Sequence, residues 1–180
     1  MIYTIPENDK HRIFTLDEVN TVFTAPRDIY NDCTKILLYS GFRVEELLRL
    51  NRSDICLDDM YFQGGLKTKA GKSRIVPIHH EIMPIVAEYC TTKDGDKVFP
   101  ISQSKLWEVM VSRYAHLPHD TRHTFISELQ SRGADHICIE RLVGHSSKGV
   151  TDKVYTHKDI QELRQTVELL AYKDIQASVI

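Results

Sequence analysis

The sequence predicts a mainly α-helical fold with a small antiparallel β-sheet, an α+β domain. Apolar residues recur every three or four positions along most of the chain, which is typical of amphipathic helices. Between about residues 54 and 78, short alternating segments and glycines replace this spacing and indicate about three strands. A chain of 180 residues is long enough for one domain with a sizeable core. We therefore expect a single domain over residues 1–180.

The first helix is predicted from about Leu16 to Phe23, because Thr15 and Glu18 form a capping-box pattern at its start. A second helix is predicted over residues 28–40, with a glycine directly after it as the C-cap. Arg43 opens a third helix. An arginine there opposes the helix dipole, which suggests that its task lies elsewhere. Glu46 lies on the same face and is expected to orient the Arg43 guanidinium.

The predicted sheet contains a basic segment. Residues 64–74 carry four cations and no acidic residue, namely Lys67, Lys69, Lys72 and Arg74. The pattern from residue 66 to 78 is typical of a β-hairpin with a glycine-containing loop. Lysines at a hairpin tip also serve solubility or protect a sheet edge, so that interpretation stays open. The net charge of −2 argues mildly against a nucleic-acid partner, but a local basic face on an acidic body would still permit one.

The second half of the chain is expected to be helical. Helices are predicted over residues 80–90, 102–114, 119–132, 135–143 and 158–172, with a further short helix around residues 154 and 155. The apolar positions of the last helix follow a stripe of threes and fours. Trp107, the only tryptophan, is expected in the core.

Composition excludes several classes of protein. No apolar run approaches the roughly 20 residues of a membrane span, and the N-terminus lacks the pattern of a signal peptide. The four cysteines are widely spaced, which makes a disulfide framework or a cysteine zinc site a poor interpretation. We expect thiols in a reducing cytoplasm.

Several groups suited to phosphodiester chemistry occur in one order along the chain. They are Arg43, Lys69, His119, Arg122, His145 and Tyr155. Paired arginines can hold a phosphate by parallel charge-assisted hydrogen bonds. A tyrosine can attack the phosphorus and form a covalent phosphotyrosine, and a lysine with a lowered pKa can protonate the leaving oxygen. Each of these residue types is more often structural, so the argument depends on their joint occurrence.

These residues lie in five segments that resemble, in order, the catalytic domain of the tyrosine recombinases, the family of phage integrases. The segments are residues 40–47, residues 68–77, His119-Asp120-Thr121-Arg122-His123, Leu142-Val143-Gly144-His145-Ser146 and Val154-Tyr155-Thr156-His157. The resemblance spans roughly residues 16–157, and the sequence around His145 and Tyr155 is similar to that of integrases of temperate phages and conjugative transposons.

The resemblance implies a role for each site residue. Arg43 and Arg122 would clamp the scissile phosphate, with Glu46 as the acidic companion of Arg43. Lys69 would be the general acid, and His119 would assist proton transfer at the tyrosine. His145 would hydrogen-bond the phosphate, and Tyr155 would be the nucleophile that gives a 3′-phosphotyrosine and a free 5′-hydroxyl. Lys67, Lys72 and Arg74 are expected to contact DNA.

The resemblance also implies partners. We expect double-stranded DNA at specific recombination sites, a homotetramer on DNA and a monomer in isolation, with directionality or host accessory factors in addition. No metal, cofactor or membrane is implied, and the compartment would be the cytoplasm. The family's N-terminal core-binding domain is expected to be absent from this chain, which begins near the boundary of the catalytic domain.

Three alternatives remain open. His119 and His123 are four residues apart and would suit a zinc hydrolase, although a third ligand is not evident and Arg122 would lie unfavourably close to a metal. A non-catalytic DNA-binding or regulatory relative would share the fold without the chemistry. A nicking-closing enzyme of the type IB topoisomerase class would use a similar pocket with a different assembly.

Overall fold

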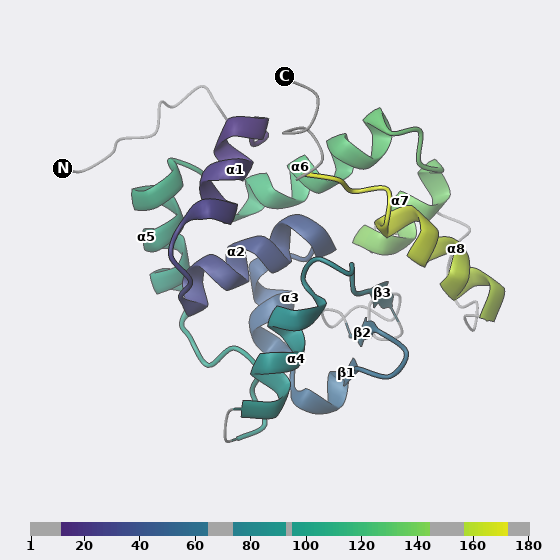
Figure 1. Cartoon of the computed structure of the whole chain (residues 1–180), viewed down its shortest axis with the longest axis horizontal. Helices are drawn as coiled ribbons and strands as arrows, with labels where there is room; N and C mark the ends of the chain where they lie inside the picture. Colours follow the sequence, from purple (N-terminus) through teal and green to yellow (C-terminus); the bar gives the residue numbers. More distant parts are fainter. Residues whose placement is uncertain (1–11, 65–73, 93–94, 145–156, 173–180) are drawn as a thin grey trace.

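The structure, a computed structural model, describes residues 12–64, 74–92, 95–144 and 157–172. Figure 1 shows helices α1, α2, α5 and α6 packed together, with the sheet beside α3, α4 and α8. In chain order the elements are α1 (Leu16–Thr24), α2 (Ile29–Ser40), α3 (Val44–Arg49), the 3-10 turn Arg52–Asp54, β1 (Ile55–Cys56), β2 (Tyr61–Gln63), β3 (Ile75–Pro77), α4 (Met83–Thr92), α5 (Gln103–Tyr114), α6 (Pro118–Ser131), α7 (His136–Val143) and α8 (His157–Val167). The predicted α+β class is confirmed.

Local signals in the sequence set the ends of several helices. The Thr15 hydroxyl accepts from the Glu18 amide and the Glu18 carboxylate accepts from the Thr15 amide, so the predicted capping box at α1 is present. Gly41 ends α2 in the left-handed conformation with φ +63°. Asp135 accepts hydrogen bonds from two amides at the start of α7, which ends at Gly144, also left-handed.

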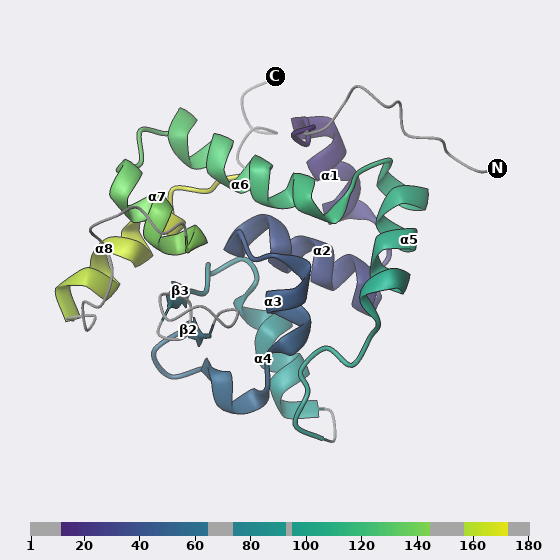
Figure 2. The same cartoon turned by 180° about the vertical axis from the view of Figure 1, so that it is seen from behind.

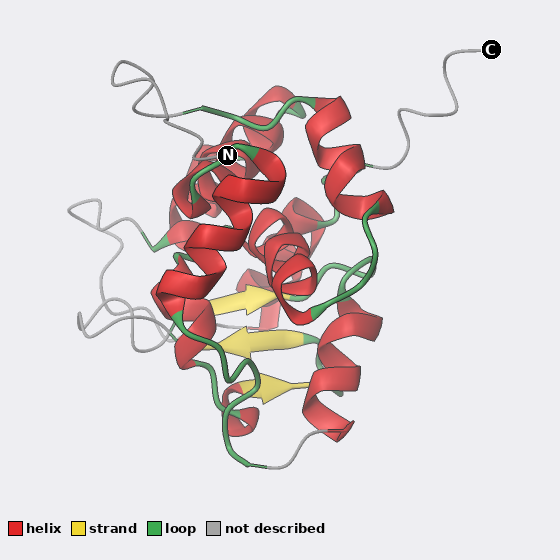
Figure 3. Ribbon diagram, turned by 90° about the vertical axis from the view of Figure 1, so that its left-hand side faces the viewer, coloured by secondary structure: helices red, strands yellow, loops and turns green. Residues whose placement is uncertain are grey.

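The three strands form one antiparallel sheet in the order β1-β2-β3. Phe62 pairs with Ile55 on one side and with Val76 on the other, and Phe62 and Val76 are fully buried. Figure 3 shows the strands lying side by side, with helices on both sides of them. The sheet predicted near residues 54–78 is therefore confirmed, whereas the proposed hairpin tip at residues 65–73 lies outside the described residues.

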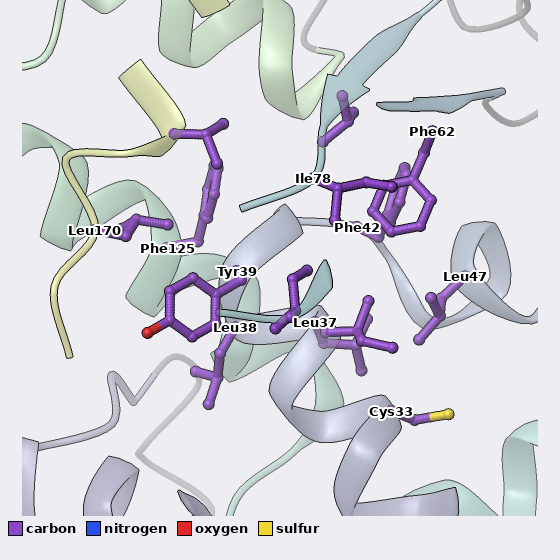
Figure 4. Packing of buried hydrophobic residues seen from close by; sticks show 14 of the residues in the cluster. Cys33, Leu37, Leu38, Tyr39, Phe42, Leu47, Phe62, Ile78, Phe125 and Leu170 are labelled. Atoms are coloured by element: carbon purple, nitrogen blue, oxygen red, sulfur yellow. The ribbon is translucent and has the colours of Figure 1, made fainter. Parts of the chain in front are cut away.

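Helix α2 forms the centre of the hydrophobic core. Ten consecutive residues of it, from Asn31 to Ser40, are buried, which is expected for a helix covered on all sides. Figure 4 shows the packing at its C-terminal half, where Leu37 and Tyr39 lie among residues from α3, β2 and α6. Seen from behind in Figure 2, α6 runs alongside α2. The face of α6 that carries Phe125 and Leu129 is thereby fixed against α2.

Three predictions need correction. Trp107 is 46% exposed on α5 and does not belong to the core, because the buried side of this helix is formed by Leu106, Val109 and Met110. Helix α4 begins at Met83 instead of residue 80, since the residues before it form a turn. Helix α8 ends at Val167 instead of residue 172, although Leu170 beyond it is still buried.

Gly41 offers a test of the contact between α2 and α6. A Cβ at Gly41 would lie 2.5 Å from Cδ1 of Phe125, whereas a Cβ at Gly133 (φ +75°) would meet nothing within 4 Å. Both glycines are left-handed, so either Gly→Ala change costs about 1–2 kcal/mol of backbone strain. We expect Gly41→Ala to lose about 1–3 kcal/mol more than Gly133→Ala, the typical cost of overpacking. Urea unfolding of both variants measures this, and equal losses would contradict the close packing.

Candidate active site

Three arginines surround one buried carboxylate, that of Glu46. Arg74 binds it with both terminal nitrogens, Nη1 to Oε1 at 3.0 Å and Nη2 to Oε2 at 3.1 Å. Nη1 of Arg43 lies 3.6 Å from Oε1, and Nη1 of Arg122 lies 3.9 Å from Oε2. The side chains of Glu46, Arg74 and Arg122 are at most 3% exposed, whereas that of Arg43 is 39% exposed. Arg43 is thus the cation of this cluster that reaches the solvent.

The start of α3 brings Arg43 and Glu46 together. Arg43 is the N-cap residue, and its backbone N–H donates to Oε2 of Glu46 at 2.8 Å. The carboxylate therefore caps a helix N-terminus, where a negative charge is favourable, and binds Arg74 at the same time. This double role fixes the first turn of α3 to the residue that precedes β3.

Arg122 projects from α6 and joins the ends of two other helices. Its Nη1 donates to the carbonyl of Gly41 at 2.8 Å and its Nη2 donates to the carbonyl of Val143 at 2.5 Å. Nη1 of Arg74 also donates to the Val143 carbonyl, at 3.0 Å. Carbonyls at helix C-termini carry partial negative charge and lack partners within the helix, which suits them to bind cations.

Gly144 is required where α7 meets Arg74. It has φ +67°, and a Cβ on it would lie 2.5 Å from Nη1 of Arg74. Any other residue would therefore be strained in its backbone and would displace the guanidinium. The end of α7 is held against Arg74 by this close approach and by the hydrogen bond to Val143.

The cluster has more positive than negative charge. Burial and, to a smaller extent, the neighbouring charges of Arg43 and Arg74 lower the pKa of Arg122 to about 9, against the opposing effect of Glu46. Burial alone would raise the pKa of Glu46, but Arg74, the Arg43 amide and Arg122 together lower it. One carboxylate does not neutralise three guanidinium groups, so the arrangement is suited to bind a further anion.

The structure brings together four of the residues predicted from the sequence, namely Arg43, Glu46, Arg74 and Arg122. The expected surface role of Arg74 needs correction, because its side chain is 2% exposed and binds Glu46. Strand alternation could have indicated this, since Arg74 shares a face with the fully buried Val76. The Glu46 carboxylate lies closer to Arg74, at 3.0 Å, than to Arg43, at 3.6 Å, although the sequence predicts Arg43 as its partner.

The remaining predicted residues are placed differently. His119 is exposed on the first turn of α6, and its ring centroid lies 4.9 Å from that of His123. Five other predicted residues lie outside the described residues, and their roles stay predictions: Lys67, Lys69, Lys72, His145 and Tyr155.

Metal binding has little geometric support in the described part of the chain. His119 and His123 are not joined there by a third histidine, cysteine or carboxylate, as the zinc hydrolase alternative would need. Within the described ranges, the one such group is His79, His80 and Glu168. The two imidazoles are stacked, with ring centroids 4.3 Å apart, and Nδ1 of His80 lies 2.5 Å from Oε2 of Glu168. Nδ1 of His79 accepts from the Glu81 amide, and Nε2 lies 2.9 Å from the Leu170 carbonyl oxygen.

Residues 12–162 match the family model described as the phage integrase family. The chain belongs to the phage integrase family. Among curated relatives, it is 26% identical over 174 residues to the tyrosine recombinase XerA of Pyrococcus horikoshii, covering 86% of this chain and 59% of that protein. It is 30% identical over 182 residues to the tyrosine recombinase XerD of Halalkalibacterium halodurans, covering 85% and 60%. This phage integrase family chain thus spans about 60% of the length of these relatives.

Solved structures share the fold of this phage integrase family member. The integrase from mycobacterium phage Brujita superimposes with a TM-score of 0.71 at 16% identity, covering 96% of this chain and 61% of that one. XerA recombinase gives 0.64 at 23% identity, covering 85% and 64%. The Tn1549 transposon integrase, solved in complex with circular intermediate DNA, gives 0.61 at 18% identity, covering 87% and 65%. In the described ranges, no helix is long and apolar enough to cross a membrane.

Replacing Glu46 tests the charge balance of the cluster. Glu46→Gln removes the buried counter-charge of Arg74 and should lower the free energy of unfolding by about 3 kcal/mol, the lower end of the range for breaking a buried ion pair, since the amide oxygen still accepts. The neighbouring exposed Glu45→Gln changes the net charge equally and should be nearly neutral. Urea unfolding measures both. Similar values for the two variants would show that Glu46 does not hold the cluster.

Anion binding should depend on the charge of Arg122. Sulfate stays a dianion across the alkaline range, so a loss of binding there comes from a change of charge on the protein and not on the ligand. With a pKa of about 9 for Arg122, sulfate affinity should be constant below pH 9 and fall above it, by at most tenfold per pH unit. Calorimetric titration with sodium sulfate measures this, with sodium chloride of equal ionic strength as the control. An Arg122→Gln variant should bind weakly at every pH, and wild-type-like affinity in that variant would place the anion elsewhere.

Proposed function

We propose that this chain is the catalytic part of a site-specific DNA recombinase that breaks and rejoins DNA strands through a covalent phosphotyrosine. The observation that carries the proposal is the arginine cluster around Glu46, in which Arg122 and the half-exposed Arg43 lie at one buried carboxylate. Membership of the phage integrase family and the tyrosine recombinase relatives support the same conclusion.

The cluster suits the transition state of phosphoryl transfer. Attack on a phosphodiester adds negative charge to the non-bridging oxygens, and preorganised guanidinium groups are positioned for that charge before the reaction begins. Arg122 is already fixed by two carbonyls and therefore needs little reorganisation. Removal of one such donor typically costs about 3–4 kcal/mol of transition-state stabilisation.

The proposed reaction has two steps. The phenol oxygen of Tyr155 attacks the scissile phosphorus, the bond from phosphorus to the 5′ oxygen breaks, and Lys69 donates a proton to that oxygen. His119 takes part in proton transfer at the tyrosine, and His145 donates a hydrogen bond to the phosphate. The free 5′-hydroxyl of the partner strand then attacks the phosphotyrosine, which releases Tyr155 and rejoins the DNA.

The proposed partner is double-stranded DNA at specific recombination sites, bound by a homotetramer, and the proposed compartment is the cytoplasm. Lys67 and Lys72 are proposed to contact phosphates. The Tn1549 integrase was solved with circular intermediate DNA and XerH recombinase with its difH substrate. Two alternatives differ from this proposal. A regulatory relative would bind DNA without cleaving it, and a nicking-closing enzyme would cleave and rejoin DNA without exchanging strands.

Covalent trapping tests the proposal. On a nicked suicide substrate that carries the ends of the encoding element, the wild-type protein should give a covalent protein–DNA band on a denaturing gel. The Tyr155→Phe variant should give none, because it lacks the attacking oxygen. Tyr61→Phe is the matched control, since Tyr61 lies in β2 and should leave the band unchanged.

The absence of a band from the wild type on verified target DNA would contradict cleavage and favour a regulatory relative. A band that persists in Tyr155→Phe would assign the nucleophile to another residue. A covalent band without joined recombinant product, when two full sites are supplied, would favour the nicking-closing alternative.

A further inference from the structure

A buried histidine lies between two carboxylates directly before α6. His116 is fully buried, with Nδ1 2.9 Å from Oδ2 of Asp120 and Nε2 3.2 Å from Oε2 of Glu18. Its ring stacks on Phe14 with centroids 3.6 Å apart and an interplanar angle of 16°. No pattern in the sequence indicates a role for His116.

Each ring nitrogen of His116 faces one carboxylate, but only the contact of Nδ1 with Asp120 has the geometry of a hydrogen bond. The charged groups around it are the two carboxylates and Arg12, whose Nη2 lies 3.0 Å from the other oxygen of Glu18. His116 therefore lies between α1 and α6, with its hydrogen bond directed to Asp120.

Asp120 connects this histidine to the first turn of α6. Oδ2 of Asp120, the same oxygen that contacts His116, also accepts from the backbone N–H of Leu117 at 2.9 Å. Leu117 is the N-cap residue and has no side-chain oxygen of its own to satisfy the free amides at the helix start. Asp120 is only 4% exposed. Without His116, its buried carboxylate would keep only the hydrogen bond from the Leu117 amide, which is unfavourable for a buried charge.

The segment before α1 is attached to the same place. The backbone N–H of Phe14 donates to the Thr124 hydroxyl at 2.8 Å, and Arg12 donates to the Ala115 carbonyl at 3.4 Å. Thr124 lies on α6 two residues after Arg122, and its hydroxyl donates to the Asp120 carbonyl at 2.7 Å. Two sets of contacts therefore hold the N-terminal half of α6, which carries His119 and Arg122. One goes through the Asp120 side chain and the other goes through the Asp120 carbonyl and Thr124.

We propose that His116 is a positioning residue of the candidate active site, which acts through Asp120 to fix the first turn of α6 and with it His119. It touches neither the phosphate nor the tyrosine in this scheme. The effect on cleavage rests on the proposed function, whereas the effect on the helix start does not. Two substitutions separate the two contacts of His116 from each other.

The amide nitrogen of an asparagine can take the place of Nδ1, and that of a glutamine can take the place of Nε2. His116→Asn should therefore keep the contact with Asp120, and His116→Gln should keep only the contact with Glu18. The control is His136→Asn on α7, because the side chain of His136 is 72% exposed. The first measurement is amide hydrogen exchange across residues 117–122. The second is the rate of covalent adduct formation at saturating DNA, with DNA affinity measured separately.

We expect His116→Gln to exchange faster at residues 117–122 and to slow adduct formation by about 10- to 100-fold, the scale for a catalytic group misplaced by roughly 1 Å. DNA affinity should stay unchanged, and His116→Asn should resemble the wild type and the control in both measurements. Equal behaviour of the Asn and Gln variants, whether both normal or both impaired, would overturn the proposal. If the wild type forms no adduct, the proposed function fails, and the exchange data alone decide the role of His116.

Discussion

The buried carboxylate of Glu46 is the constraint on which the arrangement of this site depends. It caps α3 through the Arg43 amide and binds both terminal nitrogens of Arg74. Arg74 in turn holds the Val143 carbonyl at the end of α7, to which Arg122 of α6 also donates. Elements far apart in the sequence thus meet through hydrogen bonds to one carboxylate and one carbonyl. Since buried charges are costly unless paired, displacing any one of these groups would leave another charge buried without its partner.

This arrangement is not optimal for stability. Three guanidinium groups beside one carboxylate leave a buried positive charge, and the lowered pKa of Arg122 records the cost of keeping it. Apolar residues in the same volume would often be at least as stable. The proposed binding of a phosphate gives a reason for the excess, because preorganised donors stabilise charge that develops later. An anion bound there would raise the pKa of Arg122 and stabilise the fold by linkage.

Local chemistry explains which parts of the fold could be predicted from the sequence. The capping box at Thr15, the cap at Asp135 and the left-handed Gly41 act within a few residues, so the sequence contains the whole signal. The exposure of Trp107 and the burial of Arg74 depend on which elements pack against them. The family resemblance predicted Arg43 and Arg122 as site residues, but not that Glu46 lies closer to Arg74 than to Arg43. His116 is buried beside Glu18, nearly one hundred positions earlier in the chain, and no local pattern reports such a contact.

Two sets of contacts fix helix α6, one made by Asp120 and one made by Arg122. At its start, the Asp120 carboxylate caps the helix and lies between the Leu117 amide and His116. One turn later, Arg122 donates to the carbonyls of Gly41 and Val143, which end two other helices. The first contact sets the rotation and start of the helix, whereas the second sets its distance from α2 and α7. A guanidinium can be preorganised only if its own helix cannot turn, so the contacts before the helix and the arginine within it form one support for the site.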